Sequence, residues 1–281
     1  FFNADRGDVM VGESGTELLF RLIRTAATEL PEGGAMLSST LEHPASMSAM
    51  RKWAKNTYRD HLIVKHNDET GTVDKRAYIK KLTSNVRVVS IVHTSPVTGM
   101  TVDLEKITKE VRNVAQECII IVDGIQHSSH GAIDVQKYDI DGYVVSPYKM
   151  FSRHGYGVAW ASERLCALNK EQLADGPAQN WELGTRDAGS YATFSDVVDY
   201  LDWLGSNFTD SENIRERLEV SSLAIKSHEQ ELLDLVLKGT EDLAGLTTNN
   251  KIQVIGNAAS ASREGVVSFL SLIHISEPTR Q

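Results

Sequence analysis

Two residues of opposite charge end two consecutive apolar runs of the sequence. Asp123 ends the run IIIVD, and Lys149 follows 26 residues later in SPYKMFSRHGYG, between the apolar runs IDGYVV and VAWAS. Burying a carboxylate or an ammonium group without a partner costs free energy, so a charged side chain at the end of a buried strand needs a partner or a function. A helix cap at Asp123 and a solvated surface lysine are the plain alternatives.

An amine and an acid at adjacent strand ends meet the needs of pyridoxal phosphate, which takes a lysine for a Schiff base and an acid to keep its ring nitrogen protonated. Phosphate also needs backbone amides. The stretch GESGTELLFRL offers Ser14, Gly15 and Thr16 at the start of an amphipathic helix, where free N–H groups and the helix dipole attract an anion. A capping box from Ser14 to Glu17 also explains this start, and both explanations can hold together.

Short apolar runs rich in Val and Ile alternate with amphipathic stretches along most of the chain. The runs predict strands at residues 35–39, 61–66, 86–93, 118–124, 140–146 and 156–162. The helical patterns between several of them indicate an α/β fold with a mainly parallel sheet covered on both faces. Ligands collect at the carboxyl ends of such strands, where the polar residues of this sequence cluster.

The pattern changes from Thr193 on. Long helical stretches come first, and the strands KIQVIGN and GVVSFL follow. This order predicts a connecting helix that leads into a smaller and incomplete α+β domain.

The run VDGIQHSSHGAIDVQKYDIDGYVVSPYKMFSRHGYGVAW has a distinctive order. A strand ends in Asp, a Gln follows three residues later, and an acidic turn, Ser-x-x-Lys and a Gly-rich strand come next. This order resembles the active-site segment of the class V aminotransferase family, most of all its cysteine desulfurase and selenocysteine lyase branch. The similarity extends from about residue 9 to residue 269. It implies the three-layer fold of the type I transferases that depend on pyridoxal phosphate.

The resemblance implies a role for each matched residue. Lys149 would form the Schiff base and later shuttle the α-proton of the substrate as general base and acid. Asp123 would pair with the pyridinium nitrogen, and Gln126 would hydrogen-bond the 3-hydroxyl oxygen of the ring. Ser146 would reach the phosphate, and His43 would stack on the ring. A turn amide for Gln126 and a capping role for His43 are the alternatives.

A further match concerns partners. Gly184 and Thr185 in WELGTRDAG match a family loop that contacts the phosphate bound by the partner subunit. The resemblance therefore implies a homodimer with composite sites. In the desulfurase branch, a sulfur acceptor protein is a further expected partner.

Several residues depart from the family pattern. Tyr148 stands where the desulfurase branch has His, and Pro96 stands where it has Asn. His127 follows Gln126 and either lines the substrate pocket or caps a helix. Desulfuration also needs a cysteine thiolate, and neither Cys118 nor Cys166 is placed to supply it.

The predicted function is that of a pyridoxal-phosphate-dependent enzyme acting on an amino acid, of the cysteine desulfurase type. A class V aminotransferase, or an elimination or epimerisation enzyme on the same scaffold, is the first alternative. The alternative of another class is a non-catalytic module that keeps the fold.

Composition excludes other classes of function. The net charge of −9 leaves no basic stripe for nucleic acid. No apolar stretch approaches the roughly 20 residues that span a bilayer, so no membrane association is expected. The two cysteines lack metal-ligand spacing and make a disulfide framework implausible, which predicts a cytoplasmic protein.

Both ends of the chain are expected to be truncated. The sequence starts without Met and enters the apolar run VMV at once, and LSLIHISEPTRQ resembles a translated sequencing adapter. We therefore predict a large cofactor-binding domain at residues 1–205, a partial small domain at 206–269 and a non-native tail at 270–281.

Overall fold

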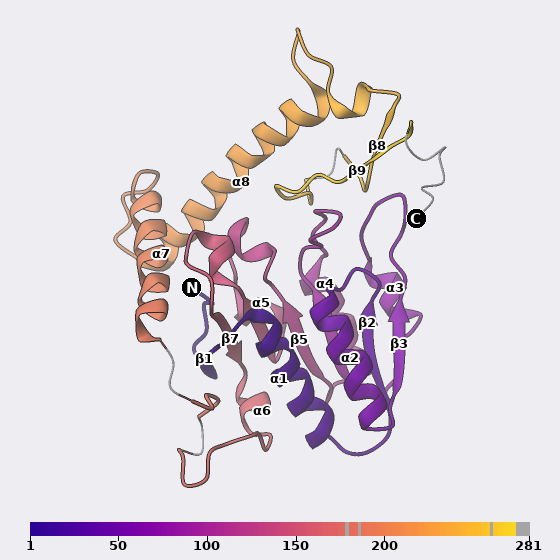
Figure 1. The fold of residues 1–281 in the computed structure, drawn as a ribbon, viewed down its shortest axis with the longest axis vertical. Helices are drawn as coiled ribbons and strands as arrows, with labels where there is room; N and C mark the ends of the chain where they lie inside the picture. Colours follow the sequence, from indigo (N-terminus) through magenta and orange to yellow (C-terminus); the bar gives the residue numbers. More distant parts are fainter. Residues whose placement is uncertain (178–179, 185–186, 259–260, 274–281) are drawn as a thin grey trace, which may run out of the picture.

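The computed structural model describes residues 1–177, 180–184, 187–258 and 261–273. Within them, seven strands form one sheet in the order β1-β7-β6-β5-β4-β2-β3 (Figure 1). The strands are β1 (Asp8–Gly12), β2 (Ala35–Ser39), β3 (Asp60–Val64), β4 (Val86–Val92), β5 (Ile119–Asp123), β6 (Gly142–Val145) and β7 (Gly157–Ala161). Strands β2 to β6 run parallel, and β7 is antiparallel to both β6 and β1. The predicted α/β class with a mainly parallel sheet is confirmed.

Strand β5 shows why the central strands read as unbroken apolar runs. Ile120 and Val122 point into one core cluster, and Ile119 and Ile121 point into the other. A parallel strand covered on both faces must be apolar at every position. The polar Asp123 can stand only at its end, where the strand opens onto the edge of the sheet.

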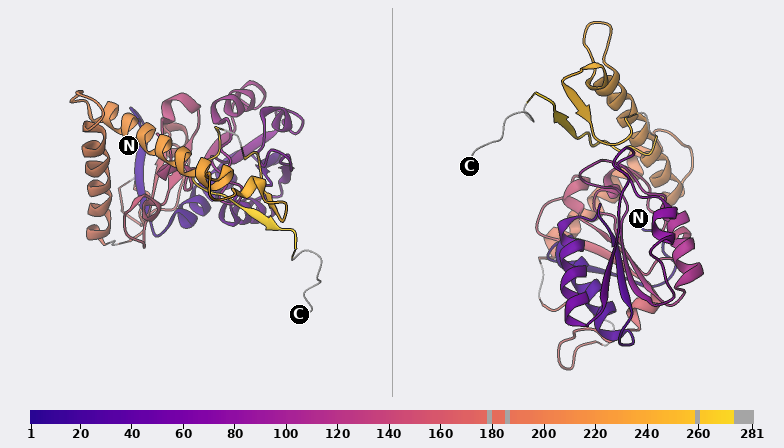
Figure 2. Two further views of the ribbon diagram at one scale, coloured as in Figure 1. Left: turned by 90° about the horizontal axis from the view of Figure 1, so that it is seen from above. Right: turned by 90° about the vertical axis from the view of Figure 1, so that its right-hand side faces the viewer.

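Helices cover the two faces and make three layers (Figure 2). Helices α1 and α2 pack in the core cluster on one face, and α3, α4 and α5 pack in the cluster on the other. The bounds are α1 (Gly15–Glu29), α2 (Pro44–Asn56), α3 (Lys75–Ile79), α4 (Leu104–Val114), α5 (Val135–Tyr138) and α6 (Glu163–Cys166). Short 3-10 turns η1 (His127–Ser129) and η2 (Pro147–Met150) follow β5 and β6. These turns carry the polar residues beyond the strand ends.

Two long helices lead to a second sheet. Helix α7 spans Ala188–Ser206, and α8 spans Ile214–Lys238. Helix α8 runs from the large sheet to β8 (Ile252–Val254) and β9 (Phe269–Ser271), which pair antiparallel (Figure 1). No helix in the described ranges is long and apolar enough to cross a bilayer.

The segment between β8 and β9 is tied back to the large domain. Arg263 is 1% exposed, and its guanidinium donates to the backbone oxygens of Thr98 (2.9 Å) and Val266 (3.1 Å). The adjacent Glu264 is also buried. This anchor brings an acidic residue from the C-terminal part close to the polar edge of the sheet.

The tail boundary predicted at residue 270 falls inside β9. Leu270 pairs with Gln253 and Ser271 pairs with Ile252, so strand pairing runs two residues into the predicted tail. Residues 274–281 lie outside the described ranges.

Candidate functional site

A cavity of about 170 Å³ opens where the carboxyl ends of β4, β5 and β6 meet the amino ends of α1 and α2. Eight of the predicted site residues line it: Ser14, Gly15, Thr16, His43, Asp123, Gln126, Ser146 and Lys149. Pro96 and Tyr148 line it as well. Residues far apart in sequence are therefore brought to one place by the parallel order of the strands.

Lys149 lies in η2, half-buried at the cavity. Its Nζ donates a hydrogen bond to Oε1 of Gln126 at 2.7 Å. Burial lowers the pKa of Lys149, and the charge of Asp123 only partly opposes this effect. The amine is thus held in place and shifted toward the neutral, nucleophilic form.

Asp123 is the buried acid of the site and is 2% exposed. Its Oδ1 accepts from the Ile125 N–H at 3.1 Å, and its Oδ2 accepts from the Ser46 hydroxyl at 3.3 Å. Burial raises the pKa of Asp123 despite these bonds and the charges of His43 and Lys149. The carboxyl group therefore lacks a full compensating charge among the described residues.

Glu42 is a second buried acid, which the sequence analysis missed. Burial and the charge of Asp123 raise its pKa from 4.5 to about 8. Its carboxylate accepts from the hydroxyls of Ser39 (3.0 Å) and Ser90 (3.2 Å) and from the Val92 N–H (3.1 Å). The available signal was its position just beyond the apolar strand β2.

The amino end of α1 closes the cavity on another side. Ser14 caps the helix, because its Oγ accepts from the Glu17 N–H at 3.1 Å. The Glu17 carboxylate pairs with Arg21 at 2.5 Å. Of the two contacts of a capping box, the observed one is therefore that of the Ser14 side chain. A Cβ added at Gly15 would lie 2.5 Å from Oγ of Ser146, which makes glycine necessary for this close approach. The first amides of α1 lie beside a serine hydroxyl, an arrangement suited to an anion.

His43 serves as the N-cap of α2 and also lines the cavity. Its Nδ1 accepts from the Ala45 N–H at 3.1 Å. The capping alternative is therefore present. Stacking on a bound ring stays a prediction.

Four other predictions have separate outcomes. Gly184 is exposed and does not line the cavity, while Thr185 lies outside the described residues. The ring of Tyr148 stacks on His154 with centroids 4.4 Å apart. His127 does not line this cavity, and it is buried with Nδ1 2.6 Å from Oε1 of Glu264. Gln126 is the N-cap residue of η1, so the capping alternative for His127 is wrong. Its place in a substrate pocket stays a prediction.

His130 is a further residue that the sequence analysis missed. It lies within hydrogen-bond distance of Gln126 and of Glu229 on α8. The sequence offered no local signal, since Glu229 is 99 residues away along the chain.

Comparison with known proteins places these features among relatives. A family model described as aminotransferase class-V matches residues 1–270. A probable cysteine desulfurase of Pseudomonas putida is 26% identical over 86% of this chain and 60% of its own length. One of Halobacterium salinarum is 25% identical over 92% and 62%. One of Mycoplasma genitalium is 26% identical over 59% and 40%. The chain thus spans about 40% to 62% of the length of these curated relatives.

Solved structures show the same fold. The cysteine desulfurase CsdA of Escherichia coli superposes with a TM-score of 0.73 at 21% identity, covering 94% of this chain and 63% of that one. The apo cysteine desulfurase of Thermococcus onnurineus also gives 0.73, at 18% identity with the same coverage.

Proposed function

Since the chain belongs to the aminotransferase class-V family, we propose that it binds pyridoxal 5′-phosphate at Lys149 and acts on an amino acid as a cysteine desulfurase-like enzyme. One observation carries the proposal. The same cavity is lined by Lys149, whose pKa is lowered, by Asp123, whose buried carboxylate lacks a full compensating positive charge, and by the amino end of α1.

The residues present fit this cofactor. The α1 amino end, with Gly15 against Ser146, suits its phosphate. The buried carboxyl of Asp123 suits a protonated ring nitrogen, which would supply the missing positive charge. The Gln126 side-chain NH₂ has a second hydrogen that is free for the ring oxygen. The ring of His43 would cover one face of the cofactor ring.

When bound, the cofactor supplies an aldehyde carbon for bonding to an amine and an electron-withdrawing ring. The chain's own residues do the rest. Because burial lowers its pKa, Lys149 can take a proton from a substrate carbon nearer neutral pH and return it later. Asp123, fixed by the Ile125 N–H and the Ser46 hydroxyl, would keep the ring nitrogen protonated. Gln126 holds the amine of Lys149 toward the cavity.

The second candidate is a class V aminotransferase, or an elimination or epimerisation enzyme, because these reactions use the same cofactor residues without a thiolate. Desulfuration needs a thiolate near the substrate. Burial raises the pKa of Cys118 to about 12, and burial also raises that of Cys166. Neither cysteine lines the cavity. Neither Cys118 nor Cys166 is therefore placed as the nucleophile of this site.

We further propose a homodimer in the cytoplasm, with a sulfur acceptor protein as an additional partner of the desulfurase reaction. Gly184 is exposed and so accessible to a second subunit. The free state of both cysteines supports a reducing compartment. Analytical ultracentrifugation would measure the mass in solution, and a monomer would contradict the dimer.

Cofactor binding is tested by mixing the purified chain with pyridoxal phosphate. We expect a new visible absorption band, and borohydride reduction should fix the cofactor on the peptide that contains Lys149. The band should be absent in Lys149→Ala and unchanged in the control Lys137→Ala, which alters an exposed lysine of α5. An unchanged spectrum in the wild-type chain would instead support the non-catalytic module.

Substrates separate the two enzyme candidates. With L-cysteine and added dithiothreitol, desulfuration forms alanine and passes a zero-valent sulfur atom to a thiol, which the excess dithiothreitol reduces to sulfide. With an amino acid and a 2-oxo acid, transamination exchanges the amino group. Whichever product accumulates identifies the reaction.

A further inference from the structure

Three side chains connect Lys149 to helix α8 by hydrogen bonds. Nζ of Lys149 donates to Oε1 of Gln126 at 2.7 Å. Nε2 of Gln126 lies 3.1 Å from Nε2 of His130. Nδ1 of His130 lies 2.8 Å from each carboxylate oxygen of Glu229. The series therefore joins the candidate catalytic amine to the helix that leads into the second sheet.

Hydrogen-bonding capacity fixes the direction of each bond. A lysine amine accepts nothing when charged, so Gln126 must present its oxygen to Lys149 and its NH₂ to His130. An amide NH₂ only donates, so Nε2 of His130 must be unprotonated. A carboxylate only accepts, so Nδ1 must carry the proton. The neutral imidazole with the proton on Nδ1 is the one protonation state that satisfies both bonds.

The charges around His130 work against this state. Burial acts to lower the pKa of His130, but the hydrogen bond and charge of Glu229, together with the charge of Glu264, outweigh burial, so the pKa is raised. Glu264, from the C-terminal segment, also raises it, and Lys149 on η2 opposes them. The bond from Gln126 requires the neutral ring, whereas Glu229 favours the charged ring. The two neighbours of His130 therefore favour different protonation states of its ring.

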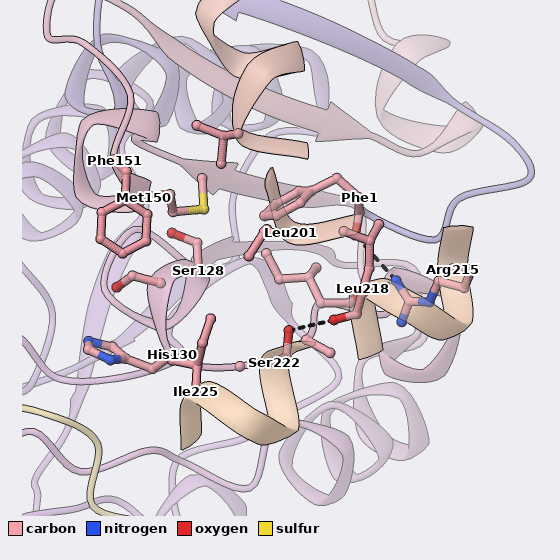
Figure 3. Close-up of a pocket in the computed structure, with 15 residues that line it drawn as sticks. Phe1, Ser128, His130, Met150, Phe151, Leu201, Arg215, Leu218, Ser222 and Ile225 are labelled. Carbon is pink, nitrogen blue, oxygen red and sulfur yellow. Dashed lines mark hydrogen bonds between the residues drawn. The ribbon is translucent and has the colours of Figure 1, made fainter. Parts of the chain in front are cut away.

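His130 also lies away from open solvent. It borders a small cavity of about 30 Å³ between η1, η2 and α8, and Figure 3 shows it at the edge of this pocket, near Ile225 of α8. Apolar side chains, among them Met150 and Leu218, also line this cavity. Apolar surroundings strengthen the contact of His130 with Glu229 relative to the same contact in water.

We propose that His130 and Glu229 are positioning residues that set the orientation of the Gln126 amide and thereby the hydrogen bond it makes to Lys149. When His130 is neutral, Gln126 turns its oxygen to Lys149. When His130 gains a proton on Nε2, the amide turns over, its oxygen accepts from His130, and its NH₂ faces the amine. The ammonium form of Lys149 then loses its acceptor and faces the NH₂ donor of Gln126 instead.

The consequence is a change in the reactivity of Lys149 as His130 titrates. A hydrogen bond to a charged group contributes about 1.5–3 kcal/mol, which corresponds to a factor of about ten or more in an equilibrium. At pH values where His130 is protonated, the uncharged fraction of Lys149 should therefore be about tenfold larger than the fraction expected from the pKa that Lys149 has when His130 is neutral.

Competitive labelling of the full chain with 2,4-dinitrofluorobenzene measures this fraction at Lys149 by mass spectrometry across pH. The proposal rests on the proposed function only for the importance of Lys149, and the test uses no cofactor. A failure of cofactor binding and a failure of this proposal are thus distinguishable. The wild-type profile should show two steps, with labelling at low pH about tenfold faster than in His130→Gln. The amide introduced by this variant bonds both Gln126 and Glu229 but does not titrate.

Two matched variants on α8 test the partner. Glu229→Gln keeps an acceptor for His130 but removes the charge, so the lower step should move to lower pH. Glu231→Gln, an exposed site on the same helix, should leave the profile as in the wild type. Superimposable profiles of wild type and His130→Gln, or equal shifts in both α8 variants, would overturn the proposal.

A measurement on the unmodified chain does not depend on any variant's folding. Nitrogen-15 NMR of labelled histidines should show His130 above its titration with a proton on Nδ1 and an accepting Nε2. A proton on Nε2 under those conditions would refute the assigned bonds.

Discussion

Replacing Glu42 by Gln should remove a large pH dependence of stability. The acid is 8% exposed, and three neutral donors bond its carboxylate. In Glu42→Gln, the amide oxygen can accept from the Ser39 hydroxyl and the Val92 N–H, and the NH₂ can donate to a reoriented Ser90 hydroxyl. The hydrogen bonds are kept, and only the titration is lost.

The magnitude follows from the pKa. The pKa of Glu42 is about 8 in the folded protein against an ordinary value of 4.5. The folded state holds the proton more tightly, so wild-type stability is highest below about pH 4.5 and falls as pH rises toward about 8. At about 1.4 kcal/mol per pH unit, the full loss approaches 5 kcal/mol, and rearrangement around the charge reduces it to about 2–5 kcal/mol.

Urea unfolding at pH 5, 7 and 9, followed by circular dichroism, measures this difference. We expect Glu42→Gln and wild type to be close at the lowest pH, and the variant to be more stable by about 2–5 kcal/mol at the highest. Glu117→Gln, at an exposed acid, is the matched control and should shift stability by under about 0.5 kcal/mol at every pH. Parallel curves for wild type and Glu42→Gln would refute the raised pKa.

Two further predictions concern the anion cradle and the buried ion pair. Gly15→Ala places a Cβ 2.5 Å from Oγ of Ser146, so affinity for pyridoxal phosphate in equilibrium dialysis should fall at least about tenfold. Pyridoxal without phosphate should lose much less, and equal losses would count against a phosphate site. Asp141→Asn removes the charge of a carboxylate that is 1% exposed and that pairs with Arg112 at 2.7 Å and with Arg164 at 3.2 Å. The free energy of unfolding in urea should fall by about 3–5 kcal/mol. A loss under about 1 kcal/mol would show that these ion pairs contribute little to stability.

Local sequence patterns predicted most of the strands of the large sheet. The apolar run at residues 35–39 coincides with β2, and the run at 118–124 exceeds β5 by one residue at each end. Both succeed for the same reason, since a strand buried on two faces leaves no polar position to blur its limits. The run GVVSFL shows the opposite case. Only its last two residues enter β9, whose residues are exposed or half-buried and so depend on pairing with β8.

Local sequence patterns also predicted which residues at the ends of strands and helices belong to the candidate site. Asp123, Lys149 and Gly15 each follow or begin a strongly patterned element, so topology alone brings them together. The partners of His130 and His127 could not be predicted in this way. Glu229 and Glu264 approach from segments 99 and 137 residues away, and only the packing of α8 and the Arg263 anchor decides that they meet these rings.

The electrostatics of the cavity connect these results. Burial raises the pKa of Asp123 and lowers the pKa of Lys149, so both groups are displaced toward neutral forms although they carry opposite charges. Glu42 adds a second acid whose charge would repel that of Asp123. A cation next to Asp123 would relieve this repulsion by stabilising the carboxylate. An acid and a base with shifted pKa values that line one cavity, as Asp123 and Lys149 do, are typical of a site built for a ligand rather than for stability. Ligand binding is thus expected to complete the charge balance that folding alone leaves open.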